Sequence, residues 1–410
     1  MRKGKRWLAA AVSAAMIVQS LASVGPVYAA DDGVSIADTF TDSSFRSYVS
    51  SNFDTDSNGY LSDAEISNVT SIDVSKCSPA ISSLNGVELF TNLSKLDCNE
   101  QSIRNLDIEN LENLEYIDVS SNRIDSLTLP VSAEKLTYLD ISGNKITSLT
   151  SLADYNNLVL LNANSTNLSS IDVSNMKGLK VLGVSGTTIS TLDLGSNMEL
   201  TTLYCDSMRS LPVLDVSGHE KLKNLYCAGA KSDSGVVVRS SITKLDVSGD
   251  IVLGSLDCSN SYVAELNIDN TPALTTLDCS NTRLTSIDVS KNTSLSYLDV
   301  SSNVLGAVDF TANTALRELY VKDTGINKLD VSTLTNLVNL DASSNSLAEL
   351  DIASNSLLEK LYISDNNIQG IKLDGHPDLK ELEIDNNNLV AIDISVCPKL
   401  YGDDGVFSCS

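Results

Sequence analysis

Residues 295–315 read LSYLDVSSNVLGAVDFTANTA, and the residues that follow begin the same pattern again. Over residues 298–301 apolar and polar side chains alternate, which is typical of a short strand with one buried face. Asn303 then fits a turn, because its short side chain can bond to neighbouring backbone and tolerates left-handed dihedrals. Residues 308–310 and Asn313 repeat this arrangement. One unit therefore consists of two short halves, each a strand followed by a turn.

The leucines that begin this pattern recur at intervals of 21 or 22 residues, with one interval of 31. A unit of this length cannot bury its apolar face alone, so neighbouring units must stack and share a core. The pattern predicts a mainly β repeat solenoid of about fourteen units. The leading residues are Leu93, Leu114, Leu136, Leu158, Leu179, Leu200, Leu222, Leu253, Leu274, Leu295, Leu316, Leu337, Leu358 and Leu379.

The unit L-x-x-L-x-[VIC]-x-x-N-x-L resembles the leucine-rich repeat signature. Its second half, L-D-V-x-x-N, is similar to the nested-period bacterial subclass sometimes called IRREKO. Residues 81–93, ISSLNGVELFTNL, resemble the repeats of internalins. The resemblance covers residues 72–400 and implies a strand-lined concave face suited to binding, although the family has no common ligand.

The N-terminus is typical of a bacterial secretory signal over residues 1–29. Four basic residues precede an apolar stretch, and Val27, Tyr28 and Ala29 supply a small-residue cleavage pattern. An uncleaved anchor is the alternative. No later stretch approaches the roughly 18 apolar residues of a spanning helix. We therefore expect a secreted protein without membrane insertion.

Residues 54–65, DTDSNGYLSDAE, match the twelve-residue EF-hand loop position by position. Such loops bind Ca²⁺, a hard cation that takes six to eight oxygen ligands. A solvated acidic turn without a metal is the alternative. The expected ligands are side-chain oxygens of Asp54, Asp56 and Asn58, the backbone carbonyl of Tyr60, Ser62 directly or through water, and both carboxylate oxygens of Glu65.

The residues beside this loop predict two helices. Asp42 can cap a helix with Phe45, Val49 and Phe53 on one face, and Ser62 can begin the exit helix. An uncapped solenoid exposes apolar side chains and strand edges. Internalins carry a helical cap related to an EF-hand at this place, and the resemblance implies a calcium-stabilised cap here.

The domain boundaries follow from these assignments. We expect a signal peptide over 1–29, an EF-hand-like cap over 30–71, the solenoid over 72–400 and a C-terminal tail or cap over 401–410.

Most of the eight cysteines take the place of Val300 in the reference unit, where the side chain points into the core. Stacked in this way they are expected to behave as small hydrophobic residues. Disulfides between stacked neighbours would be awkward in geometry but are not excluded by distance. Cys397 and Cys409 lie outside this row, and a disulfide between them remains open. The row comprises Cys98, Cys205, Cys227, Cys258 and Cys279.

The net charge of −25 predicts repulsion of nucleic acid and anionic membranes. Residues on the outward side of each strand form an acidic strip interrupted by tyrosines, which provide large contact area at low entropic cost. The alternative is that these tyrosines are simply soluble strand formers. The candidate ligand-binding residues are Tyr204, Tyr226, Tyr297, Tyr320 and Tyr362.

The interval of 31 residues contains an insertion, AGAKSDSGVVVRSS, at residues 228–241. It follows the strand that bears Tyr226, and loops held by rigid scaffolds often carry binding residues. Lys231, Val236 to Val238 and Arg239 are therefore candidates, and a neutral insertion is equally compatible with the sequence.

Nothing in the sequence supports catalysis. His219 and His376, the only histidines, are expected in surface turns, and the carboxylates recur periodically, whereas an active site needs a unique constellation. We expect a secreted, monomeric, non-catalytic protein whose concave face serves protein recognition or adhesion. A carbohydrate or cell-wall binding module and a structural surface scaffold without a specific ligand are the alternatives.

Overall fold

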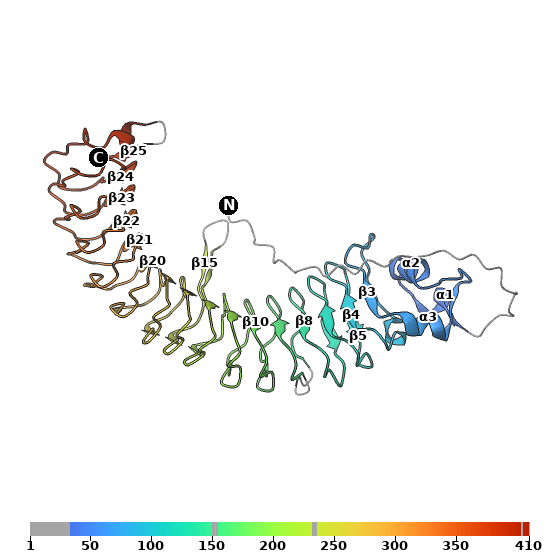
Figure 1. Cartoon of the computed structure of the whole chain (residues 1–410). Coiled ribbons are helices and arrows are strands. Elements are labelled where there is room, and N and C mark those ends of the chain that lie inside the picture. Colours follow the sequence, from blue (N-terminus) through green and yellow to red (C-terminus); the bar gives the residue numbers. More distant parts are fainter. Residues whose placement is uncertain (1–32, 150–151, 153–154, 232–235, 403–404, 410) are drawn as a thin grey trace.

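The protein is a curved solenoid with its main sheet on the inner side of the arc (Figure 1). The computed structural model describes residues 33–149, 152, 155–231, 236–402 and 405–409. The predicted signal peptide lies outside these residues. None of the described helices is long and apolar enough to cross a membrane.

The inner sheet is parallel and contains sixteen strands. A short strand begins two residues after each leading leucine. The predicted repeat solenoid is confirmed, and β3 and β25 extend its sheet beyond the fourteen repeats. The strands are β3 (Ser71–Asp73), β4 (Lys95–Asp97), β6 (Tyr116–Asp118), β8 (Tyr138–Asp140), β9 (Leu160–Asn162), β10 (Val181–Gly183), β11 (Thr202–Tyr204), β13 (Asn224–Tyr226), β17 (Ser255–Asp257), β19 (Thr276–Asp278), β20 (Tyr297–Asp299), β21 (Glu318–Tyr320), β22 (Asn339–Asp341), β23 (Lys360–Tyr362), β24 (Glu381–Glu383) and β25 (Val406–Ser408).

The core is a set of stacked aliphatic rows. Leu298, at the centre of β20, pairs in register with Leu277 and Leu319 on the neighbouring strands and is fully buried. The five cysteines expected in the core are also fully buried, as predicted, and all are free thiols. Because each side chain is covered only by the turns next to it, packing is local and repeats along the arc.

The second halves of the units lie on the outer side, and among the residues that the structure describes they form strands in two places. These are the sheet of β5 (Asn105–Asp107) and β7 (Ser126–Thr128), and the sheet of β12 (Val213–Asp215), β16 (Lys244–Asp246) and β18 (Glu265–Asn267). The prediction of two strands in every unit is therefore wrong for most units. Inner strands held about 4.8 Å apart force the outer segments of a curved solenoid to fan out, and most outer backbones are not paired.

Asparagines in the turns connect one unit to the next. The Nδ2 group of Asn303 donates to Val300 O (2.9 Å) in its own turn and to Cys279 O (2.9 Å) in the preceding turn. Its Oδ1 atom accepts Leu284 N at 3.0 Å. The expected left-handed residue is not Asn303 but Ser302, with φ 55°. Asn303 therefore supplies the buried hydrogen bonds of the turn, while Ser302 adopts the left-handed conformation that bends the chain.

Both histidines are buried, so their predicted placement in surface turns is wrong. His376 takes the turn position that Asn355 holds one unit earlier, and its ring nitrogens lie 3.2 Å from Leu373 O and 3.1 Å from Ile352 O. His219 contacts backbone carbonyls in the same way. Cys397 takes the same turn position one unit after His376 and is a buried thiol. Neither Cys397 nor the exposed Cys409 is in a disulfide.

The N-terminal cap covers the first turn of the solenoid. It consists of β1 (Val34–Ser35), α1 (Ile36–Thr39), α2 (Ser43–Asn52), β2 (Tyr60–Leu61) and α3 (Asp63–Asn68), and η1 (Val87–Leu89) follows at the first repeat. Phe90 stacks on Phe40 (6.0 Å between ring centroids) and meets Phe53 edge-on (5.3 Å). Gly86 has φ 97°, and a Cβ there would lie 2.6 Å from the Phe40 ring, so only glycine fits this junction.

The predicted helix caps are present at both cap helices. Asp42 Oδ1 accepts Ser44 N (2.9 Å) and Phe45 N (3.1 Å) at the start of α2. Ser62 and Glu65 form a capping box at the start of α3. At the other end of the arc, η2 (Pro398–Tyr401) leads to β25.

Candidate functional site

The EF-hand-like loop brings three acidic side chains together between α2 and α3. Asp54, Asp56 and Glu65 each offer a carboxylate oxygen, and these oxygens lie within 4.8 Å of one another. Gly59, with φ 84°, makes the sharp turn that such a loop requires at this position.

Backbone amides of the loop already orient these carboxylates. Asn58 N donates to Asp54 Oδ1 (3.1 Å), and Gly59 N donates to Asp54 Oδ2 (3.0 Å). Thr55 N donates to Glu65 Oε1 (2.7 Å), and Ser62 N donates to Oε2 (2.9 Å). Burial acts to raise the pKa of Glu65, but these hydrogen bonds outweigh it and lower the pKa to about 2.

Three of the six predicted calcium ligands, Asp54, Asp56 and Glu65, therefore lie close together, and their chemistry fits a hard divalent cation. Three carboxylates in close proximity repel one another, and a cation that prefers oxygen would relieve this repulsion. Asn58 and Ser62 lie in the same loop, although Asn58 Oδ1 accepts Tyr60 N (2.7 Å) and Ser62 Oγ bonds to Glu65. The Tyr60 side chain is exposed, and its backbone carbonyl stays a predicted ligand.

The second candidate region is the concave face of the inner sheet. On each inner strand from β3 to β24 the central residue is buried, as on β20 and β21, and the two residues beside it face the concavity. Tyr204 and Tyr226, on the paired strands β11 and β13, stack with centroids 5.0 Å apart and an interplanar angle of 5°. The rings of Tyr297 on β20 and Tyr320 on β21 also contact each other, with centroids 5.5 Å apart. Tyr362 stands apart on β23, where its hydroxyl donates to Glu381.

Three further residues of this face were not among the predicted ligand-binding residues. Tyr116 and Tyr138 form a stacked pair with centroids 4.2 Å apart, near the cap. Asp206 follows Tyr204 at the next inward-facing position of its turn and accepts Ala228 N at 3.0 Å. The regular spacing of the residues that flank each buried strand centre is the signal in the sequence for the tyrosine pair, whereas Asp206 lies in the turn after β11 and has no such signal.

The aspartates of this face are less exposed than the alternation predicts. Asp97, Asp118 and Asp140 are at most 9% exposed, because tyrosines and neighbouring strands crowd the inner side of the arc. Burial raises the pKa of Asp278 to about 6, and the charges of Asp257 and Asp299 add to this increase. Burial likewise raises the pKa of Asp206 to about 6.

The insertion forms a hairpin of β14 (Ala230–Lys231) and β15 (Val237–Val238), which rises from the rim of the arc (Figure 1). Arg239, a candidate ligand residue, instead fixes this hairpin to the solenoid. Its guanidinium donates to Ser261 O at 2.9 Å and to Asn281, and Tyr262 lies against it. Of the predicted insertion residues, Val236 is exposed.

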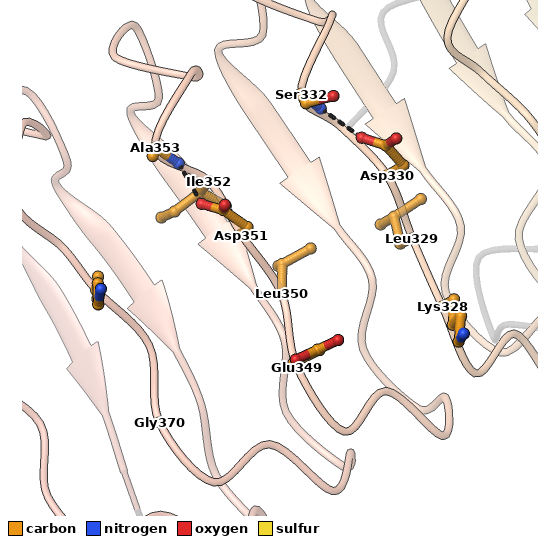
Figure 2. A pocket seen from close by; sticks show the side chains of 11 residues that line it. Lys328, Leu329, Asp330, Ser332, Glu349, Leu350, Asp351, Ile352, Ala353 and Gly370 are labelled. Atoms are coloured by element: carbon orange, nitrogen blue, oxygen red, sulfur yellow. Dashed lines mark hydrogen bonds between the residues drawn. The ribbon is translucent and has the colours of Figure 1, made fainter.

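The outer side of the arc carries open grooves between the second halves of neighbouring units. Figure 2 shows the stretch from Lys328 to Gly370, where a space of about 600 Å³ lies between successive second halves. Asp330 and Asp351 each accept the backbone amide two residues later, as in Figure 2. A similar groove recurs between residues 171 and 213. Its recurrence indicates a consequence of the repeat rather than a unique site.

Comparisons with known proteins agree with this architecture. Residues 112–154 match the family description "Leucine Rich repeats (2 copies)", and residues 291–309 match "Leucine Rich repeat". No curated protein matches the chain.

Among solved structures, the functional domain of InlJ from Listeria monocytogenes, which includes a cysteine ladder, is 31% identical. The match covers 93% of this chain and 81% of that domain as solved, with a TM-score of 0.76. The internalin InlF of Listeria monocytogenes is 18% identical over 92% of this chain and 97% of InlF (TM-score 0.56). The plant peptide hormone receptor RGFR1, solved with RGF2, is 19% identical over 74% of this chain and 61% of the receptor (TM-score 0.54).

The repeat register, the buried cysteine row and the extent of the InlJ match together show that the chain belongs to the internalin-like leucine-rich repeat proteins.

Proposed function

We propose that this chain is an exported, non-catalytic recognition protein that binds a protein partner on the concave face of its solenoid. The carrying observation is the concentration of aromatic side chains on that face, above all the stacked pair of Tyr204 and Tyr226. Tyrosine is enriched among the residues that dominate binding energy at protein interfaces. RGFR1, a solenoid of the same fold, was solved with its ligand RGF2, which supports the proposal by analogy of fold.

The rigidity of the scaffold suits this role. Each inner strand is hydrogen-bonded on both sides within the described sheet, except at its two edges, so the tyrosines are held at fixed positions. Preorganised aromatic groups lose little entropy on binding, which favours affinity.

The test is retention of surface proteins on immobilised protein of residues 30–410 in calcium, with cell-wall polysaccharide tested in parallel. We expect a discrete protein to be retained, and the double substitution Tyr204→Ala and Tyr226→Ala to reduce its retention at least tenfold. The control is Tyr60→Ala with Tyr401→Ala, because both tyrosines are exposed and lie outside the inner sheet. Retention by polysaccharide alone, or equal retention by both double variants, would refute the proposal.

We also propose that calcium binds the loop of Asp54, Asp56 and Glu65 and stabilises the cap. The convergence of the three carboxylates supports this assignment. A ligand that binds only the folded state stabilises it in proportion to the logarithm of its concentration over Kd. With a Kd of roughly 10⁻⁴ to 10⁻³ M, typical of extracellular sites, 10 mM calcium should stabilise the cap by about 1.4–2.7 kcal/mol.

Thermal unfolding in 10 mM CaCl₂ and in chelator measures this effect. We expect calcium to raise the unfolding temperature of the wild-type cap and to have no effect on Glu65→Gln, which removes the charge and keeps one oxygen for the amide of either Thr55 or Ser62. The control is Asp63→Asn, which removes an equal charge from the exposed first turn of α3 and should keep the calcium response. A Glu65→Gln protein that still responds to calcium like wild type would show that the loop is not the site.

A further inference from the structure

The C-terminal half of the concave face carries three carboxylates in a row between two aromatic rings. Tyr226, Asp257, Asp278, Asp299 and Tyr320 hold the same register position on the consecutive strands β13, β17, β19, β20 and β21. Tyr297 adds a ring on β20, two residues before Asp299. The row is therefore a strip of negative charge with aromatic faces at both ends.

One oxygen of each carboxylate has a fixed partner. Asp257 Oδ1 accepts Ser259 N (3.0 Å), Asp278 Oδ1 accepts Ser280 N (3.0 Å), and Asp299 Oδ1 accepts Ser301 N (2.9 Å). Within the described part of the chain, the second oxygens receive no hydrogen bond, and no lysine or arginine forms an ion pair with the row. Burial and mutual repulsion raise the pKa of Asp278 and of Asp299.

The other end of the same face shows what such a row accepts. There, Lys95 Nζ lies 3.5 Å from Asp97 and 3.8 Å from Asp73. The same ammonium group lies 5.1 Å from the centroid of the Tyr116 ring, which is within the range of a cation–π interaction. The protein's own lysine thus occupies the space between a carboxylate row and a tyrosine.

We propose that the partner inserts lysine or arginine side chains onto the row of Asp257, Asp278 and Asp299, so that the concave face recognises a basic polypeptide segment. This inference rests on the proposed function and specifies the chemistry of the partner. The position that Lys95 holds on β4 is taken by Thr276 on β19 and by Tyr297 on β20, so this row lacks a resident cation. A long cationic side chain from outside can fill that place and contact the ring of Tyr297 or Tyr320.

The probe is an octalysine peptide, whose binding to the full chain is measured by isothermal titration calorimetry at low salt. The test variant carries Asp257→Asn, Asp278→Asn and Asp299→Asn, each of which keeps the oxygen that accepts the serine amide. The control carries Asp288→Asn, Asp309→Asn and Asp330→Asn. These outer aspartates have the same spacing and accept the same backbone amide two residues later, and their substitution removes the same charge.

We expect the inner triple variant to weaken octalysine binding at least tenfold, and the outer triple variant to weaken it less than threefold. Equal weakening by both variants would mean that octalysine responds to the net charge of −25 alone, and it would overturn the inference. Absence of measurable octalysine binding to the wild-type protein would also overturn the inference. So would a result in which the inner triple variant loses Ca²⁺ binding but binds octalysine as wild type does.

A second variant tests the comparison between the two rows. Lys95→Met removes the resident cation beside Asp97 and should add a second octalysine site or tighten binding at least threefold. Exposed ion pairs contribute little to folding, so the variant should remain folded. Unchanged stoichiometry and affinity would show that the Lys95 arrangement is not an equivalent of the proposed site.

The outcome is separable from that of the proposed function. A partner that is lost with Tyr204→Ala and Tyr226→Ala, but indifferent to the inner triple variant, would leave concave-face recognition intact and refute the basic segment.

Discussion

Leu298→Asp is expected to lower the free energy of unfolding by about 5 kcal/mol or more. Leu298 is fully buried between Leu277 and Leu319, so the change loses about 2–3 kcal/mol of apolar burial and places a carboxylate in the core. Within the described residues, the neighbouring rows offer no charged partner at this depth. Urea unfolding followed by circular dichroism measures the loss.

The matched control is the neighbouring position, Asp299→Leu. Asp299 faces the concavity, and burial together with nearby carboxylates raises its pKa, so its removal relieves repulsion. We expect the control to unfold within about 1 kcal/mol of wild type. If Asp299→Leu proved as damaging as Leu298→Asp, the assignment of inner and core-facing sides on β20 would be wrong.

Asn303→Leu is the second large expected effect, about 3–5 kcal/mol of lost stability. The asparagine is 5% exposed and satisfies backbone groups in its own turn and in the preceding unit, including Cys279 O and Leu284 N. Leucine has a similar size but cannot bond to them, and each buried polar group left without a partner costs about 1–3 kcal/mol. The same urea titration measures the change.

Asn336→Leu provides the comparison for this loss. Asn336 also donates to the preceding turn, to Thr314 O at 2.9 Å, but it does so at the exposed surface, where water can replace the bond. We expect a change below about 1 kcal/mol. Equal losses of unfolding free energy for Asn303→Leu and Asn336→Leu would indicate that burial does not determine how much such asparagines contribute to stability.

The inner sheet could be predicted from sequence because its signal is repeated in every unit. A leucine every 21 or 22 residues leaves one register in which all apolar positions point into the core. The same spacing places the five cysteines in one buried row. It also explains why the histidines are buried. His376 stands 21 residues after Asn355 and therefore enters the same buried turn, whatever the usual preference of histidine for the surface.

Features that depend on curvature could not be predicted in this way. The second halves of the units have nearly the same sequence throughout, yet only five of them form strands in the described chain. Whether neighbouring outer backbones pair depends on the distance between them, which the curvature of the whole solenoid sets. The sequence of a single unit does not determine that curvature. The partial burial of Asp97, Asp118 and Asp140 has the same origin, because curvature crowds the inner face.

The candidate sites also include features that the sequence predicts and features that it does not. The calcium ligands form a contiguous motif, and the structure brings its three carboxylates together, while calcium binding itself remains a prediction. The tyrosine pairs depend on which residues the register places side by side, so the pairing of Tyr204 with Tyr226 could be anticipated from the spacing. Asp206 could not, because it lies in the turn beyond the end of β11, where the alternation of the strand no longer decides which way a side chain points.

Site-specific photocrosslinking tests concave-face recognition most directly. A photoreactive residue is placed at Thr202, beside Tyr204 on the inner sheet, or at Ser290 on the exposed outer side. Each protein of residues 30–410 is then irradiated with surface-protein extract in calcium. If the partner binds the concave face, Thr202 gives an adduct with one discrete protein and Ser290 gives none. Adducts of the same protein from Ser290 alone, or equally from both positions, would contradict concave-face recognition.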